Sequence, residues 1–228
     1  MNQTDVSIFP SIMCSKAWEI KDYLHAFEQV GVSAVHFDVM DGHYVPNIML
    51  GTNTFNDIHA TTNLPIDVHL MCVEPERYIS YFKFQEGDWV SFHPEVCNQS
   101  YRLMQNLHDK GLHAGLALSP GISVSYLEEC LSVLDFVLIM AVNPGFAGQK
   151  MVPDHLDKIR RVCRTVGRAD HKIEIIVDGN TTAENAKDMH HAGATGFVTG
   201  TSSMMHEGAA GFVRLYHEYC AALQTVNS

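Results

Sequence analysis

The feature that most constrains the fold of this chain is a regular alternation of short apolar runs with stretches of helical spacing. The runs are rich in β-branched and aromatic residues and predict strands, at 7–13, 34–38, 66–71, 89–92, 113–118, 136–140, 173–177 and 196–198. Helices are predicted at 16–30, 53–60, 74–85, 101–110, 124–134, 153–166, 182–192 and 212–223. Strict alternation of this kind implies parallel strands joined by helical crossovers.

Eight such units in 228 residues favour a closed α/β structure, the (β/α)8 or TIM barrel. No linker, charge run or low-complexity segment interrupts the pattern, so residues 1–228 are expected to form a single barrel domain. With 46% hydrophobic residues the chain can bury a large core. An open, doubly wound sheet is the alternative architecture.

The charge of the chain limits its partners. Lys and Arg number 15 against 26 Asp and Glu, which gives a net charge of −11. This balance argues against a nucleic-acid surface and against binding to anionic membranes. An anionic substrate must therefore be held by local groups, such as backbone N–H groups at helix starts.

Cysteine usage and the first residues indicate a cytoplasmic protein. Six cysteines are scattered without a Cys-x-x-Cys pair, which is typical of free thiols in a reducing compartment. Residues 1–10 lack the basic and apolar regions of a signal peptide. No apolar run approaches the roughly 18 residues of a membrane span.

Four polar residues stand at or near the ends of three predicted strands. His36 and Asp38 alternate in the second strand and so share one face, His69 lies in the third, and Asp178 directly follows the seventh. Individually, His69 reads as a hydrogen-bonded core histidine and Asp178 as a helix cap. In a barrel, however, the carboxyl ends of strands meet at one end. Two imidazoles and two carboxylates there predict one divalent metal ion, with Zn favoured over Fe, Mn or Co. His93, which follows the fourth strand, is a further candidate for the pocket wall.

Glycine-bearing turns follow the last three strands, at 143–149, 178–180 and 200–202. Glycine lets backbone N–H groups approach an anion closely, and barrels often bind phosphate at the loops of their last two strands. The simpler interpretation is that these glycines only allow the chain to turn tightly. The turns match no Walker or dinucleotide motif.

A metal ion beside two carboxylates and a phosphate site suggests carbon-acid chemistry on a sugar phosphate. The metal would stabilise an enediolate, while Asp38 and Asp178 remove a proton from one face of a carbon and return one to the other. That exchange inverts a stereocentre without a redox cofactor. Met40, Met71 and Met140 also end strands and would cover the enediolate; otherwise they fill gaps in the core.

Several segments resemble the ribulose-phosphate 3-epimerases, over nearly the whole chain. The most specific are His36-Phe37-Asp38-Val39-Met40-Asp41-Gly42-His43-Tyr44-Val45-Pro46-Asn47 and Val142-Asn143-Pro144-Gly145-Phe146-Ala147-Gly148-Gln149. Shorter ones are Pro10-Ser11-Ile12, Asp67-Val68-His69-Leu70-Met71, Gly115-Leu116-Ala117-Leu118-Ser119-Pro120 and Val177-Asp178-Gly179.

The resemblance implies a (β/α)8 barrel that interconverts D-ribulose 5-phosphate and D-xylulose 5-phosphate. It implies Asp38 and Asp178 as the acid/base pair and His36, Asp38, His69 and Asp178 as metal ligands. The substrate-binding residues it implies are Ser11, His69, Gly145, Phe146, Ala147, Gly148, Gly179, Asn180, Gly200 and Thr201. A phosphorylated ketose would be the partner, and a homo-oligomer is left open.

Three positions depart from the family pattern: Ala147, Asn180 and Thr201 stand where Gly, Gly and Ser are usual. Several of these departures, along with Met13-Cys14 and His93-Pro94-Glu95, look similar to the related D-allulose-6-phosphate 3-epimerases, which act on a six-carbon ketose phosphate. That activity is the alternative to the pentulose reaction. Two further readings are a metal-dependent hydrolase and a non-catalytic sugar-phosphate sensor.

Overall fold

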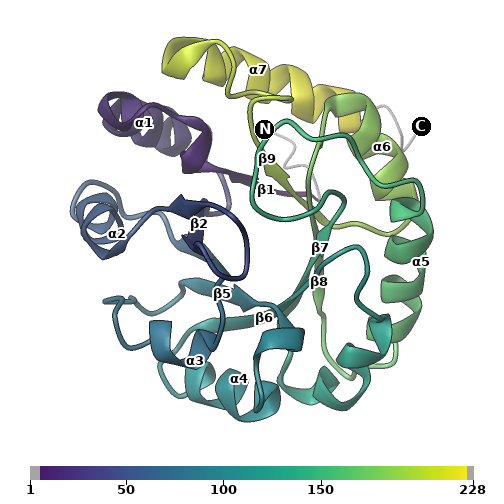
Figure 1. Ribbon diagram of the computed structural model, residues 1–228. Coiled ribbons are helices and arrows are strands. Elements are labelled where there is room, and N and C mark those ends of the chain that lie inside the picture. The colour runs from purple at the N-terminus through teal and green to yellow at the C-terminus, as the bar shows by residue number, and fades with distance from the viewer. Residues whose placement is uncertain (1–5, 225–228) are drawn as a thin grey trace.

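Eight parallel strands form the centre of the computed structural model, which describes residues 6–224. Their order around the sheet is β1-β9-β8-β7-β6-β5-β4-β2. The two ends meet through a parallel bridge between Ser11 and His36, and the Ser33 N–H donates to the Ile8 carbonyl at 3.0 Å. The predicted barrel is therefore confirmed (Figure 1). The strands are β1 (Ser7–Pro10), β2 (Val35–Asp41), β4 (Ile66–Met71), β5 (Trp89–Phe92), β6 (His113–Leu118), β7 (Phe136–Met140), β8 (Glu174–Asp178) and β9 (Gly196–Thr199).

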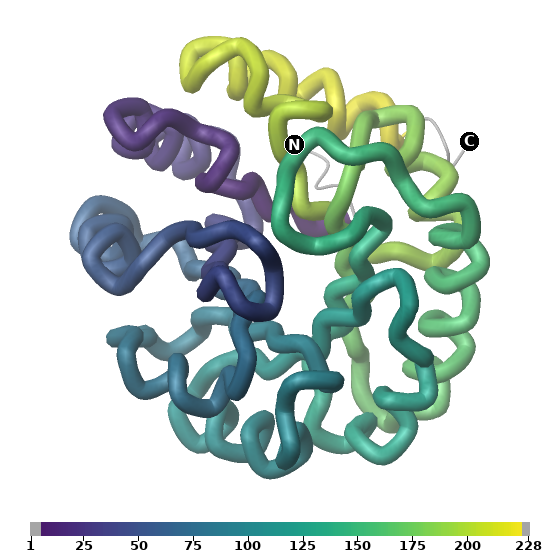
Figure 2. The backbone as a smooth tube through the Cα atoms, viewed as in Figure 1, coloured from purple at the N-terminus to yellow at the C-terminus, as the bar shows by residue number. Residues whose placement is uncertain are grey.

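Helices surround the strands on the outside. Figure 2 shows that α1 and α7, which lie far apart in the sequence, are neighbours in this outer layer. The Phe27 ring of α1 packs against Phe212 of α7 with ring centroids 4.7 Å apart. The helices are α1 (Ile20–Val30), α2 (Thr52–His59), α3 (Pro75–Tyr78), α4 (Ser100–His108), the 3₁₀ helix η4 (Val124–Val133), α5 (His155–Val166), α6 (Ala183–His191) and α7 (Gly208–Gln224).

Two predicted helices differ from the expectation. The helix expected at 74–85 ends at Tyr78, because Phe82 and Phe84, two residues apart, both turn inward against Phe55. One helical face cannot present both side chains. The helix expected at 124–134 is a 3₁₀ helix, in which every third residue is buried. That spacing matches the three residues per turn of a 3₁₀ helix.

A ninth strand was not predicted. β3 (Ile48–Met49) pairs antiparallel with the end of β2, where Met49 lies opposite Met40. Asp41 closes the intervening turn, since its Oδ1 accepts from the N–H groups of His43 and Tyr44 at 2.8 and 2.9 Å. The last helix also begins earlier than expected, at Gly208.

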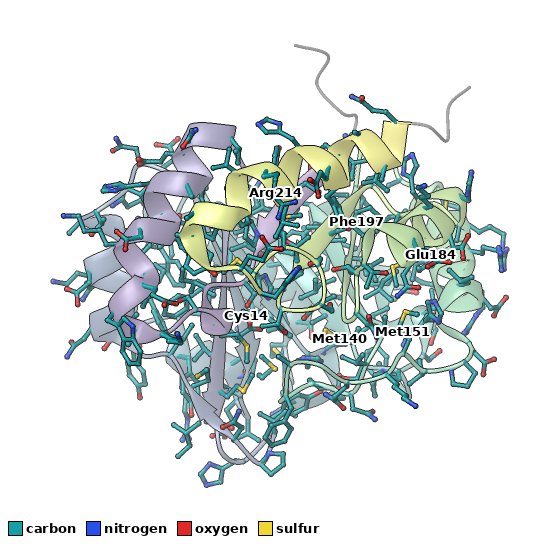
Figure 3. The ribbon with its side chains drawn as sticks, turned by 90° about the horizontal axis from the view of Figure 1, so that it is seen from above. Cys14, Met140, Met151, Glu184, Phe197 and Arg214 are labelled. Atoms are coloured by element: carbon teal, nitrogen blue, oxygen red, sulfur yellow. The ribbon has the colours of Figure 1, made fainter. Side chains whose placement is uncertain are left out.

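The molecule has two main apolar layers. One lies between the strands and the helices and contains side chains such as Phe37 and Leu116. The other fills the barrel interior and includes Phe9, Phe136 and Met140. Figure 3, turned by 90° from Figure 1, labels Met140 near the middle of the molecule and Arg214 on α7. The strand alternation therefore directs every second side chain toward the barrel axis.

The elements above belong to one sheet with its helical layer, so the fold of the described residues agrees with a single barrel domain. The predicted domain also includes residues 1–5 and 225–228, which lie outside the described residues. Within residues 6–224, no helix is both long enough and apolar enough to cross a membrane.

Candidate metal centre and substrate pocket

Register brings the four predicted ligands together at the carboxyl end of the barrel. Asp38 of β2 lies beside His69 of β4 in the parallel ladder, and His36 lies one inward-facing position earlier. Asp178 ends β8. One ligand atom of each of these residues lies within 4.8 Å of the others. The arrangement of two imidazole nitrogens and two carboxylates fits a divalent metal ion.

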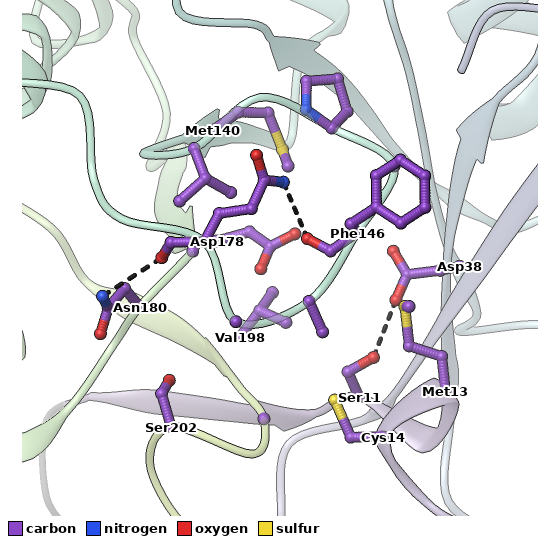
Figure 4. Close-up of a pocket in the computed structure, with 18 of the residues that line it drawn as sticks. Ser11, Met13, Cys14, Asp38, Met140, Phe146, Asp178, Asn180, Val198 and Ser202 are labelled. Atoms are coloured by element: carbon purple, nitrogen blue, oxygen red, sulfur yellow. Dashed lines mark hydrogen bonds between the residues drawn. The ribbon is translucent and has the colours of Figure 1, made fainter. Parts of the chain in front are cut away.

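The carboxylate of Asp38 lies at the centre of this cluster. Its Oδ1 is 3.2 Å from Nε2 of His36 and 3.3 Å from Nδ1 of His69. The hydroxyl of Ser11 donates to its Oδ2 at 2.8 Å (Figure 4). Because both imidazoles turn these nitrogens toward one carboxylate, His36 Nε2 and His69 Nδ1 are the atoms available to a cation.

The outer nitrogens of both histidines have buried partners that were not predicted. Nδ1 of His36 lies 2.6 Å from Oδ2 of Asp67, which precedes His69 by two residues and shares its strand face. Nε2 of His69 lies 2.9 Å from Nε2 of His93. Such partners fix the orientation and tautomer of a metal-binding imidazole. The alternation of side chains along β4 could have placed Asp67 on the same face as His69. The contact between His93 and His69 depends on side-chain conformation, which the sequence does not give.

The two acidic ligands have pKa values shifted in opposite directions. Burial alone would raise the pKa of Asp38, but the charge of His36 and hydrogen bonds from both imidazoles outweigh it and hold the pKa well below its usual range. Desolvation raises the pKa of Asp178 to about 6, with a further contribution from the charge of Asp38.

Burial and the charges of His69 and Lys158 lower the pKa of His93 well below its ordinary value.

A pocket opens above the cluster, and Asp38 and Asp178 reach it from different sides (Figure 4). Met40, Met71 and Met140 line it, as predicted. His36 and His69 are fully buried beneath it and do not line it. The other predicted residues that do line the pocket are Ser11, Gly145, Phe146, Ala147, Gly148, Gly179, Asn180, Gly200 and Thr201.

The loop after β7 crosses the mouth of this pocket. Gly145 and Gly148 have φ angles of +118° and +77°, which favour glycine. The loop is held by Gln149, whose side-chain amide donates to the Phe146 carbonyl at 2.8 Å, and by Asn47, which donates to the Gly145 carbonyl at 2.9 Å. The Phe146 side chain remains 53% exposed.

The loops after β8 and β9 form the opposite wall. Asn180, a departure from the family pattern, has a φ of +51°, a conformation that Asn tolerates better than most residues. Its side chain donates to the Gln149 carbonyl at 3.2 Å. In the turn after β9, the N–H of Gly200 donates to the Ser203 hydroxyl at 3.0 Å, so this N–H is paired within its own turn.

Several pocket residues were not predicted as site residues. They come mainly from the turn after β1 and from residues beside the predicted loops: Met13, Cys14, Val142, Asn143, Pro144, Gln149, Thr181, Val198 and Ser202. Asn143, Pro144, Gln149 and Ser202 lie within the glycine-bearing turns 143–149 and 200–202 that the sequence indicated as a possible anion site, whereas the others adjoin predicted residues. His93, a candidate for the pocket wall, instead lies behind His69.

The sequence profile of the ribulose-phosphate 3 epimerase family matches residues 7–204. The chain belongs to the ribulose-phosphate 3-epimerase family. The expectation of an isomerase is thereby confirmed.

Bacterial relatives of this family member cover most of its length. The ribulose-phosphate 3-epimerase of Bacillus subtilis is 38% identical over 200 residues, covering 86% of this chain and 91% of the relative. That of Aquifex aeolicus is 36% identical over 192 residues, covering 84% of this chain and 86% of the relative. That of Escherichia coli K12 is 36% identical over 196 residues, with 86% and 87% covered.

Solved structures with low sequence identity share the fold of this epimerase family member. The tryptophan synthase α-subunit of Pyrococcus furiosus superposes with a TM-score of 0.64 at 12% identity, covering 99% of this chain and all of that one. Thiamine phosphate pyrophosphorylase of the same organism has a TM-score of 0.57 at 13% identity, with 98% and 96% covered. At such low identity these similarities concern the barrel alone.

Proposed function

We propose that this protein is a metal-dependent ketose-phosphate 3-epimerase that interconverts D-ribulose 5-phosphate and D-xylulose 5-phosphate. The observation that carries the proposal is the placement of two carboxyl groups, Asp38 and Asp178, on different sides of one pocket, within a four-residue group able to hold a metal ion. The names of the bacterial relatives support the pentulose substrate.

In the proposed reaction, one aspartate takes the proton from C3 and the other returns a proton to the opposite face. The electron pair of the broken C–H bond moves toward the C2 carbonyl and comes back when the new C–H bond forms, so no redox cofactor is consumed. Asp38 and Asp178 reach the pocket from different sides (Figure 4), which suits one carboxylate to remove the proton and the other to return it.

The remaining residues hold the groups that react. A divalent cation held at the cluster would supply electrostatic stabilisation for negative charge that develops on the substrate oxygens. His36 and His69 would hold that cation together with the two aspartates, and Ser11 orients Asp38 through its hydrogen bond. Met40, Met71 and Met140 line the pocket with apolar surface and so exclude water from the reacting carbons.

We further propose that the phosphate lies against the loops after β7, β8 and β9. The positive φ angles of Gly148, Gly179 and Asn180 turn the backbone sharply at the pocket wall, an arrangement that can present N–H groups to an anion. In a chain of net charge −11, local backbone groups are the natural anion site.

One experiment tests both the reaction and the substrate. Steady-state rates are compared for D-ribulose 5-phosphate and D-allulose 6-phosphate, because the three departures from the family pattern, Ala147, Asn180 and Thr201, all line the pocket. Incorporation of solvent deuterium at C3 is followed in the same samples. We expect turnover of the pentulose to dominate and deuterium to appear at C3.

Asp178→Asn, measured beside the wild type, is expected to lower kcat by a factor of about 10² to 10⁴, since it removes one acid/base group. Asp170→Asn, which changes an exposed aspartate, is the control and should leave the rate unchanged. Release of inorganic phosphate would support a hydrolase instead. Binding without deuterium exchange would support a sensor, and faster turnover of the hexulose would replace the substrate assignment.

A further inference from the structure

We propose that His93 positions the cation-binding nitrogen of His69. A chain of hydrogen bonds leads from His69 through His93 to the carboxylate of Glu95, and at each step the group nearer His69 is the donor. The inference rests on the proposed metal centre. It assigns roles to four residues outside the ligand set and outside the pocket wall, namely Tyr44, His93, Glu95 and Ser119. We call these four residues the relay.

The first contact of the relay is buried and short. His93 follows β5, is fully buried, and places its Nε2 2.9 Å from Nε2 of His69. Its Nδ1 lies 3.1 Å from the hydroxyl of Ser119, in the turn after β6. Both ring nitrogens of His93 therefore have polar neighbours, and one must donate while the other accepts in a neutral imidazole.

The cation-binding role of His69 sets the direction of the protons. Nδ1 of His69 faces Asp38 at 3.3 Å, so a cation bound there uses the lone pair of this nitrogen. The proton of His69 is then on Nε2 and is donated to Nε2 of His93. His93 consequently carries its own proton on Nδ1 and donates it to Ser119.

The far end of the relay sets the same direction independently. The hydroxyls of Tyr44 and Ser119 are 2.8 Å apart, and the Tyr44 hydroxyl lies 2.7 Å from Oε1 of Glu95. An ionised carboxylate can only accept, so Tyr44 donates to Glu95 and is free to accept from Ser119. Ser119 can then accept from His93, which is the direction that the metal site requires.

Surrounding contacts hold the relay in place. The buried ammonium of Lys158 donates to the carbonyls of Ser119, Pro120 and Ile122, which fixes the turn carrying Ser119. The Tyr44 ring packs over His93 with centroids 4.5 Å apart. The other histidine ligand, His36, contacts its carboxylate Asp67 directly. His36 is thus oriented directly by a carboxylate, whereas His69 is oriented through His93, whose Nδ1 lies 3.7 Å from Oε1 of Glu95, beyond hydrogen-bond distance.

The test measures metal affinity, not activity. Dissociation constants for Zn²⁺ and Co²⁺ are obtained by competition with a chromophoric chelator. His93→Leu should weaken binding about 10- to 100-fold, as expected for loss of an outer partner of a ligand. His93→Gln should recover most of the affinity, because its amide oxygen can accept from His69. Tyr44→Phe should give a smaller loss, and Tyr126→Phe, which removes an exposed hydroxyl outside the relay, should give none.

A second measurement does not depend on folding of the variants. Histidine ¹⁵N spectra of the zinc-loaded wild type should show His69 protonated on Nε2 and His93 on Nδ1. A proton on Nε2 of His93, or wild-type affinity in His93→Leu, would overturn the relay while leaving the metal centre intact. Failure of the wild type to bind either metal would overturn the metal centre, and the relay with it.

Discussion

At the scale of single residues, the surroundings give two chemically identical side chains different properties. Asp38 accepts from Ser11 and faces two imidazoles, whereas Asp178 ends its strand in a desolvated position beside a second carboxylate. The first environment lowers the pKa of its carboxyl group and the second raises it.

Ser11→Ala tests this dependence. It removes the hydroxyl that donates to Oδ2 of Asp38 and leaves the carboxylate free to rotate. A hydrogen bond to a charged group contributes about 1.5 kcal/mol or more, so kcat should fall roughly 10-fold with little change in substrate affinity. Ser80→Ala, at an exposed serine, is the control. An unchanged kcat would show that Asp38 needs no such support.

Lys158 gives a pH-dependent stability with a definite sign. Burial and the charge of Arg161 lower its pKa from 10.5 to about 8, although Glu95 acts in the opposite direction. Between pH 8 and 10.5 the unfolded chain therefore binds more protons than the native protein. The contribution of Lys158 to stability must rise with pH in this window, by at most about 1.4 kcal/mol per pH unit.

Urea unfolding of the wild type and Lys158→Met at pH 7, 8, 9 and 10 isolates this contribution. The difference in unfolding free energy should be constant below pH 8 and should increase above it. Other groups that titrate in the same range are common to both proteins and cancel. A difference that stays flat up to pH 10 would mean that Lys158 keeps its ordinary pKa.

At the scale of the elements, neighbouring strands constrain each other's side chains inside the barrel. Gly115 of β6 lies opposite Phe136 of β7 in the ladder. A Cβ at Gly115 would come within 2.4 Å of the Phe136 ring, so the ring occupies the space that the glycine leaves. The pair shows how a small residue on one strand admits a large one on the next.

Gly115→Ala is accordingly expected to destabilise the protein by about 1–3 kcal/mol, because the Phe136 ring has to move within a packed interior. Gly121→Ala is a matched control, since a Cβ at Gly121 has no atom within 4 Å and its φ is not in the left-handed region. Chemical denaturation gives both values. Equal stability of the two variants would indicate that the interior repacks freely.

At the scale of the whole molecule, the barrel joins ligands that are far apart in the sequence. His36 and Asp178 come from strands β2 and β8, so a cation bound between them links distant parts of the sheet. Such a link exists only in the folded state, and binding therefore stabilises that state.

Cytoplasmic location and homo-oligomer formation stay predictions.

Metal removal should accordingly lower the melting temperature. At a free metal concentration about 1,000 times the dissociation constant, binding contributes about 4 kcal/mol. For a chain of this size that corresponds to a shift of roughly 8–16 °C between metal-loaded and chelator-treated protein. His36→Ala should show no metal-dependent shift. Identical melting curves for the loaded and stripped wild type would argue against a structural role of the cation.

The sequence by itself determined the barrel and the four residues that lie together as the candidate metal centre. Apolar runs and helical spacing depend on local periodicity, and the carboxyl ends of parallel strands must meet, so His36, Asp38, His69 and Asp178 could be grouped without coordinates. The loops at 143–149, 178–180 and 200–202 were indicated by their glycines, and the family resemblance added the individual substrate-binding residues within them. The shortened α3 and the 3₁₀ form of η4 were not foreseen, because inward packing overrode helical propensity there.

Only the tertiary structure decided what surrounds the metal centre. The contact of His93 with His69, and its continuation through Ser119 and Tyr44, depend on side-chain rotamers and on the path of three separate loops. The same is true of the Gly200 N–H, which is already paired within its own turn. Periodicity assigns a residue to a face of a strand, but the hydrogen-bond partner depends on atoms that distant segments bring to that face.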